Sequence, residues 1–273
     1  MSEISNKVKE IIKNADSILI GAGAGLSTAA GINYAGEDFK REFAPFIRKY
    51  GFTDLYTSSF YDFNSQEEYW AYWAKHIYFA NTGREGEKLY KNIYEAVKDK
   101  DYFVVTTNVD DQFYKSGFDA NKIFRVQGSY AFNQCTMACH DKLYSNKELV
   151  DKMVNNIDDN LKVPSNLVPK CPVCGEDMEP NLRKDGYFVE DELWHKQNDI
   201  YGEFLDKNKD KKLVLLEFGV GFNTPGIIRF PFEKMVAQNK NWTLIRFNRE
   251  TQCYYEWDEE NFVPIEEDIN SIF

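Results

Sequence analysis

The chain reads Ser17-Ile18-Leu19-Ile20-Gly21-Ala22-Gly23-Ala24-Gly25 near its start, an apolar run that passes into alternating small residues. A short apolar run bounded by turn residues predicts a buried strand, and the small residues that follow predict a tight turn into a helix. Backbone N–H groups in such a turn can approach a pyrophosphate without obstruction from side chains. We therefore predict an α/β fold whose first loop offers these candidate cofactor-binding residues: Ala22, Gly23, Ala24, Gly25 and Leu26.

This first loop departs from the ordinary dinucleotide fingerprint. The fingerprint has a third glycine where this chain has Leu26, and it has an acidic residue at the end of a second strand about 20 residues further on, which we do not find. A glycine-rich turn without a ligand therefore stays open as an alternative for this loop taken alone.

Four further apolar runs end in polar residues or glycine, as strands of a parallel sheet do when a ligand lies at their carboxyl ends. They are residues 102–106, 122–126, 212–218 and 242–247. The candidate ligand-binding residues at these ends are Thr107, Asn108, Asp110, Gln127, Gly219, Val220, Gly221, Asn223 and Asn248. The alternative for Asn108 and Asp110 is that they only cap the next helix.

Four of the five cysteines form two close pairs, Cys135-x-x-x-Cys139 and Cys171-x-x-Cys174. Four thiolates at such spacings can converge on one Zn²⁺, and a complete set of four leaves no open position for catalysis. We therefore predict a structural zinc site. Two disulfides or four unrelated core cysteines are the alternatives, and His140 could replace one thiolate as a ligand.

Nothing at the start of the sequence reads as a signal peptide, and no apolar run approaches the ~18 residues of a membrane span. We therefore expect a cytoplasmic protein, where disulfides do not persist. The net charge of -11 disfavours nucleic acid and anionic membranes as partners. A length of 273 residues fits one main domain with a smaller inserted module. Aromatic residues concentrate between Phe39 and Phe79, which predicts a helical lobe there. We expect His76 to be a packed or surface histidine of this lobe, with a role as a ligand as the alternative.

Taken in order, these motifs resemble the sirtuins, a family of NAD-consuming deacylases and ADP-ribosyltransferases. Residues 23–27 are similar to the family's first loop, and residues 106–110 resemble its Thr-Gln-Asn-Ile-Asp motif. Gln127-Gly128 stands where the family has His-Gly, and the four cysteines come next. Residues 219–221 resemble its late Gly-Thr-Ser loop, and Asn248 matches the asparagine that holds the adenine-side ribose.

The resemblance implies a Rossmann-like parallel sheet with helices on both faces, plus a smaller inserted helical and zinc-binding domain. Residues 1–36, 84–128 and 186–273 would form the discontinuous NAD-binding domain. Residues 37–83, as a helical lobe, and 129–185, as a zinc module, would form the small domain.

Two departures from the family separate this chain from its deacylases. The usual Pro-Asp-Phe-Arg after Gly31-Ile32 is replaced by residues 33–36, Asn-Tyr-Ala-Gly, so the nicotinamide-covering Phe and the catalytic Arg are missing. Gln127 replaces the histidine that serves deacylases as general base. An amide can orient a hydroxyl but cannot take its proton, and general-base catalysis supplies about 10² to 10⁴-fold. We therefore expect deacylation to be feeble or absent. Tyr34 would cap the nicotinamide pocket or else pack on the helical lobe.

The combination of Leu-Ser-x-Ala-Ala-Gly at residues 26–31, a tyrosine three residues on and Gln127 is similar to the macrodomain-linked (class M) sirtuins of microbial pathogens. This resemblance implies an NAD-dependent protein ADP-ribosyltransferase. Its acceptor would be a lipoylated carrier protein related to the glycine-cleavage H protein, in a system linked to oxidative stress, and a macrodomain hydrolase would reverse the modification. An NAD-dependent deacylase and a non-catalytic NAD or ADP-ribose sensor are the alternatives.

In the transferase, Asn108 and Gln127 would be catalytic at the nicotinamide end, with Asp110 beside them. The first loop would hold the pyrophosphate. The residues that would line the adenosine half are Gly219, Gly221, Asn223 and Asn248.

Overall fold

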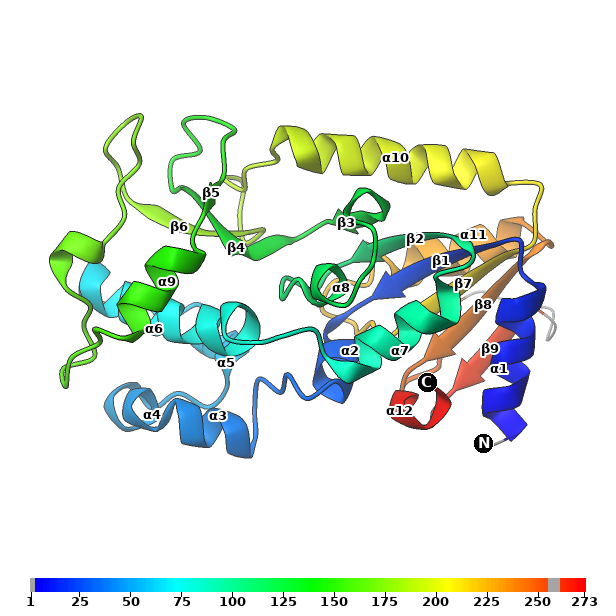
Figure 1. Cartoon of the computed structure of the whole chain (residues 1–273), viewed down its shortest axis with the longest axis horizontal. Helices are drawn as coiled ribbons and strands as arrows, with labels where there is room; N and C mark the ends of the chain where they lie inside the picture. The colour runs from blue at the N-terminus through cyan, green and yellow to red at the C-terminus, as the bar shows by residue number, and fades with distance from the viewer. Residues whose placement is uncertain (1–2, 255–260) are drawn as a thin grey trace. The chain divides into compact units, whose positions relative to one another are not determined.

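The computed structural model describes residues 3–254 and 261–273, and the chain divides into two compact units (Figure 1). The first unit comprises Met1–Gly31, Gly86–Gln127 and Glu192–Phe273, and the second comprises Ile32–Glu85 and Gly128–Asp191. Among the helices of the described residues, none is long and apolar enough to cross a membrane.

The first unit is built on a six-stranded sheet in which every neighbouring pair is parallel. Its strands are β1 (Ser17–Ala22), β2 (Asp101–Thr106), β3 (Ile123–Arg125), β7 (Leu213–Phe218), β8 (Trp242–Phe247) and β9 (Phe262–Ile265). In the order β3-β2-β1-β7-β8-β9, the strands after β1 are added toward one edge of the sheet and the strands from β7 onward toward the other edge. The topological switch point therefore lies between β1 and β7. In open α/β sheets, ligands bind at such a switch point, outside the carboxyl ends of the strands.

The pairing register brings the four central strands to an end at the same level. Ala22 of β1 pairs with Thr106 of β2 and with Phe218 of β7, and Phe218 pairs with Phe247 of β8. The loops that follow these strands therefore start side by side along one edge of the sheet.

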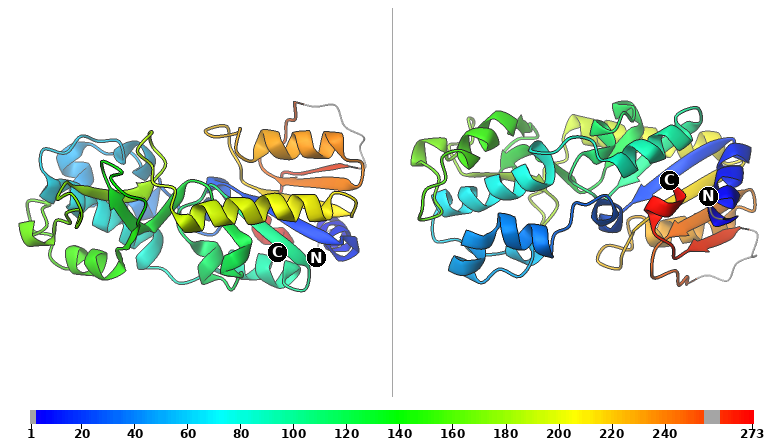
Figure 2. Two further views of the ribbon diagram at one scale, coloured as in Figure 1. Left: turned by 90° about the horizontal axis from the view of Figure 1, so that it is seen from above. Right: turned by 60° about the horizontal axis from the view of Figure 1, so that its bottom comes forward.

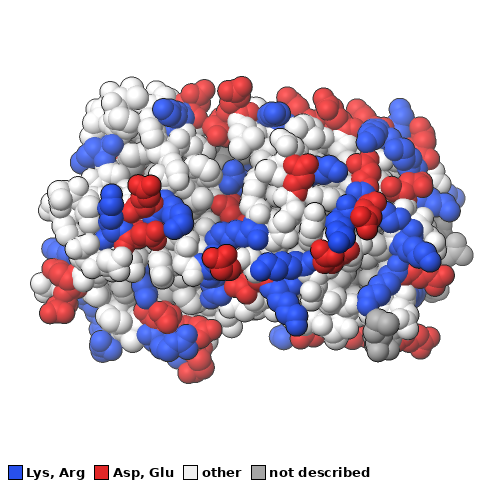
Figure 3. Space-filling model, in the orientation of Figure 1, with Lys and Arg blue, Asp and Glu red and all other residues white. Residues whose placement is uncertain are grey.

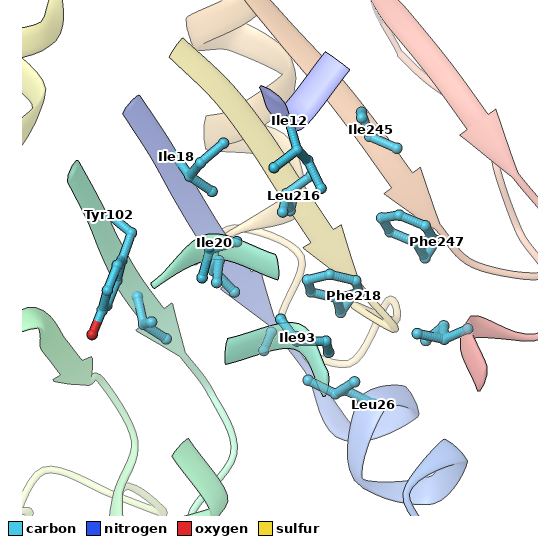
Figure 4. Close-up of a cluster of buried hydrophobic side chains, with 14 of the residues drawn as sticks. Ile12, Ile18, Ile20, Leu26, Ile93, Tyr102, Leu216, Phe218, Ile245 and Phe247 are labelled. Atoms are coloured by element: carbon cyan, nitrogen blue, oxygen red, sulfur yellow. The ribbon is translucent and has the colours of Figure 1, made fainter. Parts of the chain in front are cut away.

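Helices cover both faces of this sheet because successive strand residues point to opposite sides. One face, with Ile18, Ile20, Leu216 and Phe218, packs against apolar residues of α1 (Glu3–Asn14), α7 (Lys88–Val97) and α12 (Ile269–Ile272), as Figure 4 shows in part. The other face packs against α10 (Glu192–Asn208) and α11 (Arg229–Gln238), the yellow and orange helices of Figure 2. The predicted α/β fold with a parallel sheet between helices is confirmed.

Short helices complete the first unit: α2 (Ala24–Ala29) follows β1, α8 (Gln112–Lys115) follows β2, and the 3-10 turn η2 (Ala120–Lys122) precedes β3. The sheet differs from prediction mainly at its edges. β3 is shorter than predicted, and β9 was not predicted at all, because a four-residue edge strand that contains Pro264 carries little strand signal.

The second unit combines helices with a three-stranded antiparallel sheet of order β5-β4-β6. Its strands are β4 (Gly128–Cys135), β5 (Tyr144–Ser145) and β6 (Met178–Leu182). Its helices are α3 (Glu37–Glu42), α4 (Ala44–Tyr50), α5 (Leu55–Ser58), α6 (Gln66–Ile77), the π-helical η1 (Tyr78–Thr82), α9 (Lys147–Val154) and the 3-10 turn η3 (Ser165–Leu167). Aromatic side chains fill its interior, and Phe39, Phe43, Trp70 and Tyr72 are fully buried, which accounts for the aromatic-rich stretch of the sequence.

Charge on the viewed face is mixed rather than segregated, since Figure 3 shows basic and acidic side chains interleaved. Several exposed lysines pair with neighbouring carboxylates, as Lys98 does with Glu95 at 2.6 Å. The excess of 44 acidic over 33 basic residues therefore does not gather into one block in this view.

Candidate functional site

Three glycines let the loops after β1 and β7 pack directly against each other at the switch point. The N–H of Gly23 donates to Phe218 O at 2.9 Å, and that of Gly25 donates to Gly219 O at 3.0 Å. A Cβ at Gly25 would lie 2.7 Å from Gly219 Cα, and one at Gly219, where φ is 57°, would lie 2.5 Å from the carbonyl carbon of Gly25. Larger residues could not occupy these positions, because the clash would be with backbone.

The other residues of the first loop fall into different environments. Ala22 ends β1, and its carbonyl accepts from the N–H of Thr107 at 3.0 Å, so the ends of β1 and β2 are joined. Leu26 is fully buried in the core, in the place where the dinucleotide fingerprint has glycine. Ala24 and Gly25 are exposed. Of the predicted loop, only these two residues are exposed.

A buried chain of hydrogen bonds connects the loops after β1 and β2. The amide Nδ2 of Asn108 donates to Gly23 O at 2.9 Å and to the Tyr90 hydroxyl at 3.2 Å. The hydroxyls of Tyr90 and Ser27 are 3.0 Å apart, and the Ser27 hydroxyl donates to Asp110 Oδ2 at 2.5 Å. Since Ser27 gives its hydrogen to the carboxylate, Tyr90 is the donor to Ser27. From Asn108 to Asp110, each hydrogen bond in this series is therefore donated toward Asp110.

This series of hydrogen bonds has two chemical consequences. Both amide hydrogens of Asn108 are committed within the protein, so its carbonyl oxygen is the atom that it can offer to a ligand. Burial raises the pKa of Asp110 to about 6, against the hydrogen bonds from Ser27 and from the N–H of Gln112. Near neutral pH the carboxyl is therefore mostly ionised, which suits the direction of the donors.

Ser27 and Tyr90 were not predicted as members of the site. Tyr90 lies on α7, where its sequence neighbours Leu89 and Ile93 mark it as a core residue, and it is fully buried. Its hydroxyl meets residues 18 and 63 positions away. No local pattern could therefore have indicated this pairing.

Gln127 follows β3 in a turn and carries a polar atom without a partner. Its Oε1 is buried and accepts no hydrogen bond from any described residue. An unsatisfied buried acceptor costs about 1 to 3 kcal/mol, so a ligand hydroxyl that donates to it would remove that cost. The residue after it must be glycine, because Gly128 has φ of 91° and a Cβ there would lie 2.1 Å from Asn181 O.

Two hydrogen bonds join the chain just after β7 to the end of β8 and the residue that follows it. Asn248 Nδ2 donates to Val220 O at 2.8 Å, and the N–H of Gly219 donates to Phe247 O at 2.9 Å. Gly221 and Asn223 are exposed at the surface of the same loop. The predicted residues at the ends of β1, β2, β7 and β8 thus lie along one edge of the first unit.

Tyr34 belongs instead to the second unit, where a chain of rings holds it. Its hydroxyl is 3.0 Å from that of Tyr130, which is 3.1 Å from His76 Nε2, and His76 Nδ1 is 3.2 Å from the Tyr72 hydroxyl. Burial lowers the pKa of His76 to about 3, so the imidazole is neutral. His76 is a packed core residue with both ring nitrogens in hydrogen bonds.

The four predicted cysteines come together in the second unit. Their Sγ atoms all lie within 4.8 Å of one another, with Cys135 and Cys174 3.6 Å apart and Cys139 and Cys171 3.7 Å apart. A tetrahedron with zinc–sulfur bonds of about 2.3 Å has edges of about 3.8 Å, whereas a disulfide requires about 2.05 Å. The set therefore fits Zn²⁺ and excludes the disulfide alternative.

The pKa values of these thiols are shifted in opposite directions. Backbone N–H groups of Cys174 and Val173 lower the pKa of Cys171 to about 6, whereas the neighbouring Cys174 sulfur raises the pKa of Cys139. Four adjacent thiolates repel one another, so they ionise together only around a metal. Among the described residues, the group that could hold a metal ion here consists of the four cysteine sulfurs alone.

His140 supports the cluster from beside it rather than as part of the set. Its Nδ1 accepts from the N–H of Lys142 at 3.2 Å, which leaves the hydrogen on Nε2. Nε2 is 3.5 Å from Cys171 Sγ, so the ring donates to that sulfur. Such donors to ligand atoms are typical of the surroundings of a protein metal site.

Comparison with known proteins places these features in context. A family model described as Sir2 family matches residues 23–208. The chain is 34% identical over 266 residues to a protein ADP-ribosyltransferase of Staphylococcus aureus (strain Mu50 / ATCC 700699), over 97% of this chain and 84% of that protein. It is 31% identical to a probable bifunctional ADP-ribose hydrolase/ADP-ribosyltransferase of Fusarium oxysporum f. sp. cubense, over 93% of this chain but 44% of that protein.

A solved structure of a Sir2 homologue in complex with NAD is similar in fold. Its TM-score is 0.58 at 15% identity, and the match covers 99% of this chain and 92% of that one.

Proposed function

This chain belongs to the Sir2 family, and from that premise we propose that it is an NAD-dependent protein ADP-ribosyltransferase that releases nicotinamide and modifies a protein acceptor. The name of the Staphylococcus aureus relative supports this activity. The observation that carries the proposal is Gln127, whose buried Oε1 lacks a donor and whose amide cannot accept a proton.

In the proposed reaction the bond between nicotinamide and C1′ of its ribose breaks, and nicotinamide leaves with the electron pair. A nucleophile on the acceptor protein then forms a bond to C1′ and loses its proton to water. The oxygens of Asn108 and Gln127 would each accept a hydrogen bond from a ribose hydroxyl and so fix the ring during this exchange. The side-chain amides of Asn108 and Gln127 cannot take up a proton. None of these steps requires a base that removes a proton from a ribose hydroxyl.

Asp110 acts in this proposal through the chain that ends at Asn108. Its ionised carboxylate anchors the Ser27 hydroxyl, and through Tyr90 it fixes which way the Asn108 amide faces. The exposed backbone of Ala24 and Gly25 would face the pyrophosphate, and the loops after β7 and β8 would hold adenosine. Bound zinc would tie together the segments around the four cysteines and take no part in the reaction, because four sulfur ligands leave it no open position.

We further propose a lipoylated carrier protein, related to the glycine-cleavage H protein, as the acceptor, and a macrodomain hydrolase as the enzyme that removes the modification. The resemblance to class M sirtuins suggests both, together with a role in oxidative stress. The combined name of the Fusarium relative, hydrolase and transferase, supports the pairing of the two activities. We place the reaction in the cytoplasm, where thiols stay reduced and can hold zinc.

The test is transfer of label from ³²P-NAD to a lipoylated carrier, with the same carrier lacking lipoate as the matched control. We expect labelled carrier and free nicotinamide in equal amounts, and neither product from Asn108→Ala. Formation of O-acyl-ADP-ribose from an acyl-lysine peptide would establish the deacylase instead. Binding of NAD by calorimetry without transfer to any acceptor would establish the sensor.

A further inference from the structure

Four charged side chains are fully buried together at the carboxyl ends of β7 and β8, apart from the residues proposed to touch NAD. Glu217 and Arg246 pair across the two strands, and α11 supplies Arg229 and Glu233 from positions one turn apart. Each of the four side chains is 0% exposed. We call this group the Arg–Glu quartet.

The quartet is neutral overall and closely paired. Arg246 binds Glu217 through two parallel hydrogen bonds, from Nε at 2.7 Å and from Nη2 at 2.9 Å. The same Nη2 lies 2.8 Å from Glu233 Oε1, and Arg229 Nε lies 3.9 Å from that oxygen. Two guanidinium groups and two carboxylates thus compensate one another out of contact with water.

Other nitrogens of the two guanidinium groups donate to backbone carbonyls after β8, whereas Arg229 Nε forms no hydrogen bond with a described residue. Arg229 Nη2 donates to the carbonyls of Glu250 and Gln252, each at 2.8 Å, and Arg246 Nη1 donates to Gln252 O at 2.8 Å. The N–H of Tyr254 donates to Glu233 Oε2 at 3.0 Å. The charged groups of the quartet therefore hold the backbone of residues 250–254, which follow β8.

Core stability alone does not account for these charges. The nearest residues on the same face of the sheet are apolar, Leu215 on β7 and Leu244 on β8, and they pack against α11. Burying a charge costs several kcal/mol, and a well-packed apolar group is often no less stabilising than a buried ion pair. What an apolar group cannot do is bind loop carbonyls. The quartet is thus suited to fixing the positions of the loops.

We propose that Arg229 is a positioning residue for the adenosine half of an adenine nucleotide. Its Nη1 donates to Val220 O at 3.1 Å, and Asn248 Nδ2 donates to the same oxygen at 2.8 Å. Arg229 therefore fixes the carbonyl against which Asn248 is oriented, while its other donors hold the segment after β8. This inference rests on the proposed function, because it assumes that the adenosine of NAD binds at these two loops.

Calorimetric titration with ADP-ribose tests the proposal in two variants. Arg229→Met removes all three carbonyl contacts, and Arg229→Lys keeps the charge but cannot bridge the carbonyls. We expect the Kd for ADP-ribose to rise about tenfold in both, as for the loss of a charge-assisted hydrogen bond. In transfer assays KM for NAD should rise by a similar factor, while kcat stays within twofold of the wild type.

Phe232→Leu is the matched structural control, because Phe232 is a fully buried residue of the same helix and its side chain has no hydrogen-bonding group. It should lower the melting temperature without changing the Kd. If Arg229→Met does not fold, Arg229→Lys decides. An unchanged Kd in Arg229→Lys, or an equal rise in Phe232→Leu, overturns the inference.

Failure of this inference and failure of the proposed function give different results. If the wild type binds ADP-ribose but transfers nothing, the transferase proposal fails, and the comparison of Kd values still decides the role of Arg229. If Arg229→Lys binds like the wild type, the positioning role fails whether or not transfer occurs. A wild type that does not bind ADP-ribose overturns both.

Discussion

Removal of the Tyr90 hydroxyl is the sharpest test of how Asn108 is held. Tyr90→Phe keeps the buried ring and deletes one oxygen, which in the native protein accepts from Asn108 at 3.2 Å and donates to Ser27 at 3.0 Å. Asn108 keeps its bond to Gly23 O at 2.9 Å, so the amide loses one of its two anchors. At about 1 kcal/mol for each lost hydrogen bond, we expect the free energy of unfolding to fall by about 2 kcal/mol.

The effect on the reaction should exceed what this instability explains. Loosening the group that orients the ribose should reduce kcat for transfer about tenfold at a temperature where the variant is fully folded. Urea unfolding of Tyr90→Phe, Asn108→Ala and the double variant should show a coupling of about 1 kcal/mol, because the two residues share a bond. Tyr94→Phe, on the same helix, is the control and should behave as wild type. Additive unfolding energies together with an unchanged kcat for Tyr90→Phe would refute the reasoning.

Three further predictions concern other parts of the structure. Burial raises the pKa of Asp110 from 3.8 to about 6, so as pH rises this carboxyl ionises in the unfolded chain before it ionises in the folded protein. The free energy of unfolding should therefore fall by about 3 kcal/mol between about pH 4 and 6. Urea titrations of Asp110→Asn should not show this fall, and a pH profile identical to that of the wild type would contradict the assignment. Cys171→Ser should lose bound zinc by atomic absorption and melt at a lower temperature, whereas Cys253→Ser should keep its metal. Gly219→Ala should abolish ADP-ribose binding, because its φ is 57° and its Cβ would meet the backbone of Gly25. Gly202→Ala on α10, where a Cβ meets nothing within 4 Å, is the control and should bind normally.

The central sheet could be predicted because each of its main strands carries its own pattern in the sequence. β1, β2, β7 and β8 are continuous apolar runs that end in glycine or polar residues, and burial on both faces of a parallel sheet produces that signal within each strand. The zinc site was equally accessible, since each half of it is a short loop between two cysteines. Both inferences depend on local sequence alone.

The connections between these segments could not be predicted in the same way. Glu217 is the penultimate residue of an otherwise apolar strand, and only the register of β7 with β8 shows that it faces Arg246. The link from Asn108 to Asp110 runs through Tyr90, whose position on α7 has the pattern of an ordinary core residue. Polar residues that pair over long sequence separations produce no periodic pattern in the sequence. The sequence therefore indicated the residues at the strand ends but not the buried polar contacts that hold them in place.

The two ends of the proposed NAD site are stabilised by different kinds of interaction, and this difference determines how the reaction should respond to pH. At the nicotinamide end, Asn108 is oriented by neutral hydrogen-bond donors that run to a single carboxylate, Asp110, whose charge depends on pH near 6. At the adenosine end, the loops are held by the Arg–Glu quartet, whose four side chains are 0% exposed and in which Arg246 forms two hydrogen bonds with Glu217. Acidification toward pH 6 should therefore weaken the orientation of the reacting ribose, because that orientation depends on the charge of Asp110. A fall in kcat with an unchanged KM for NAD is the pattern expected of such a site, because binding energy and orientation reside in separate groups.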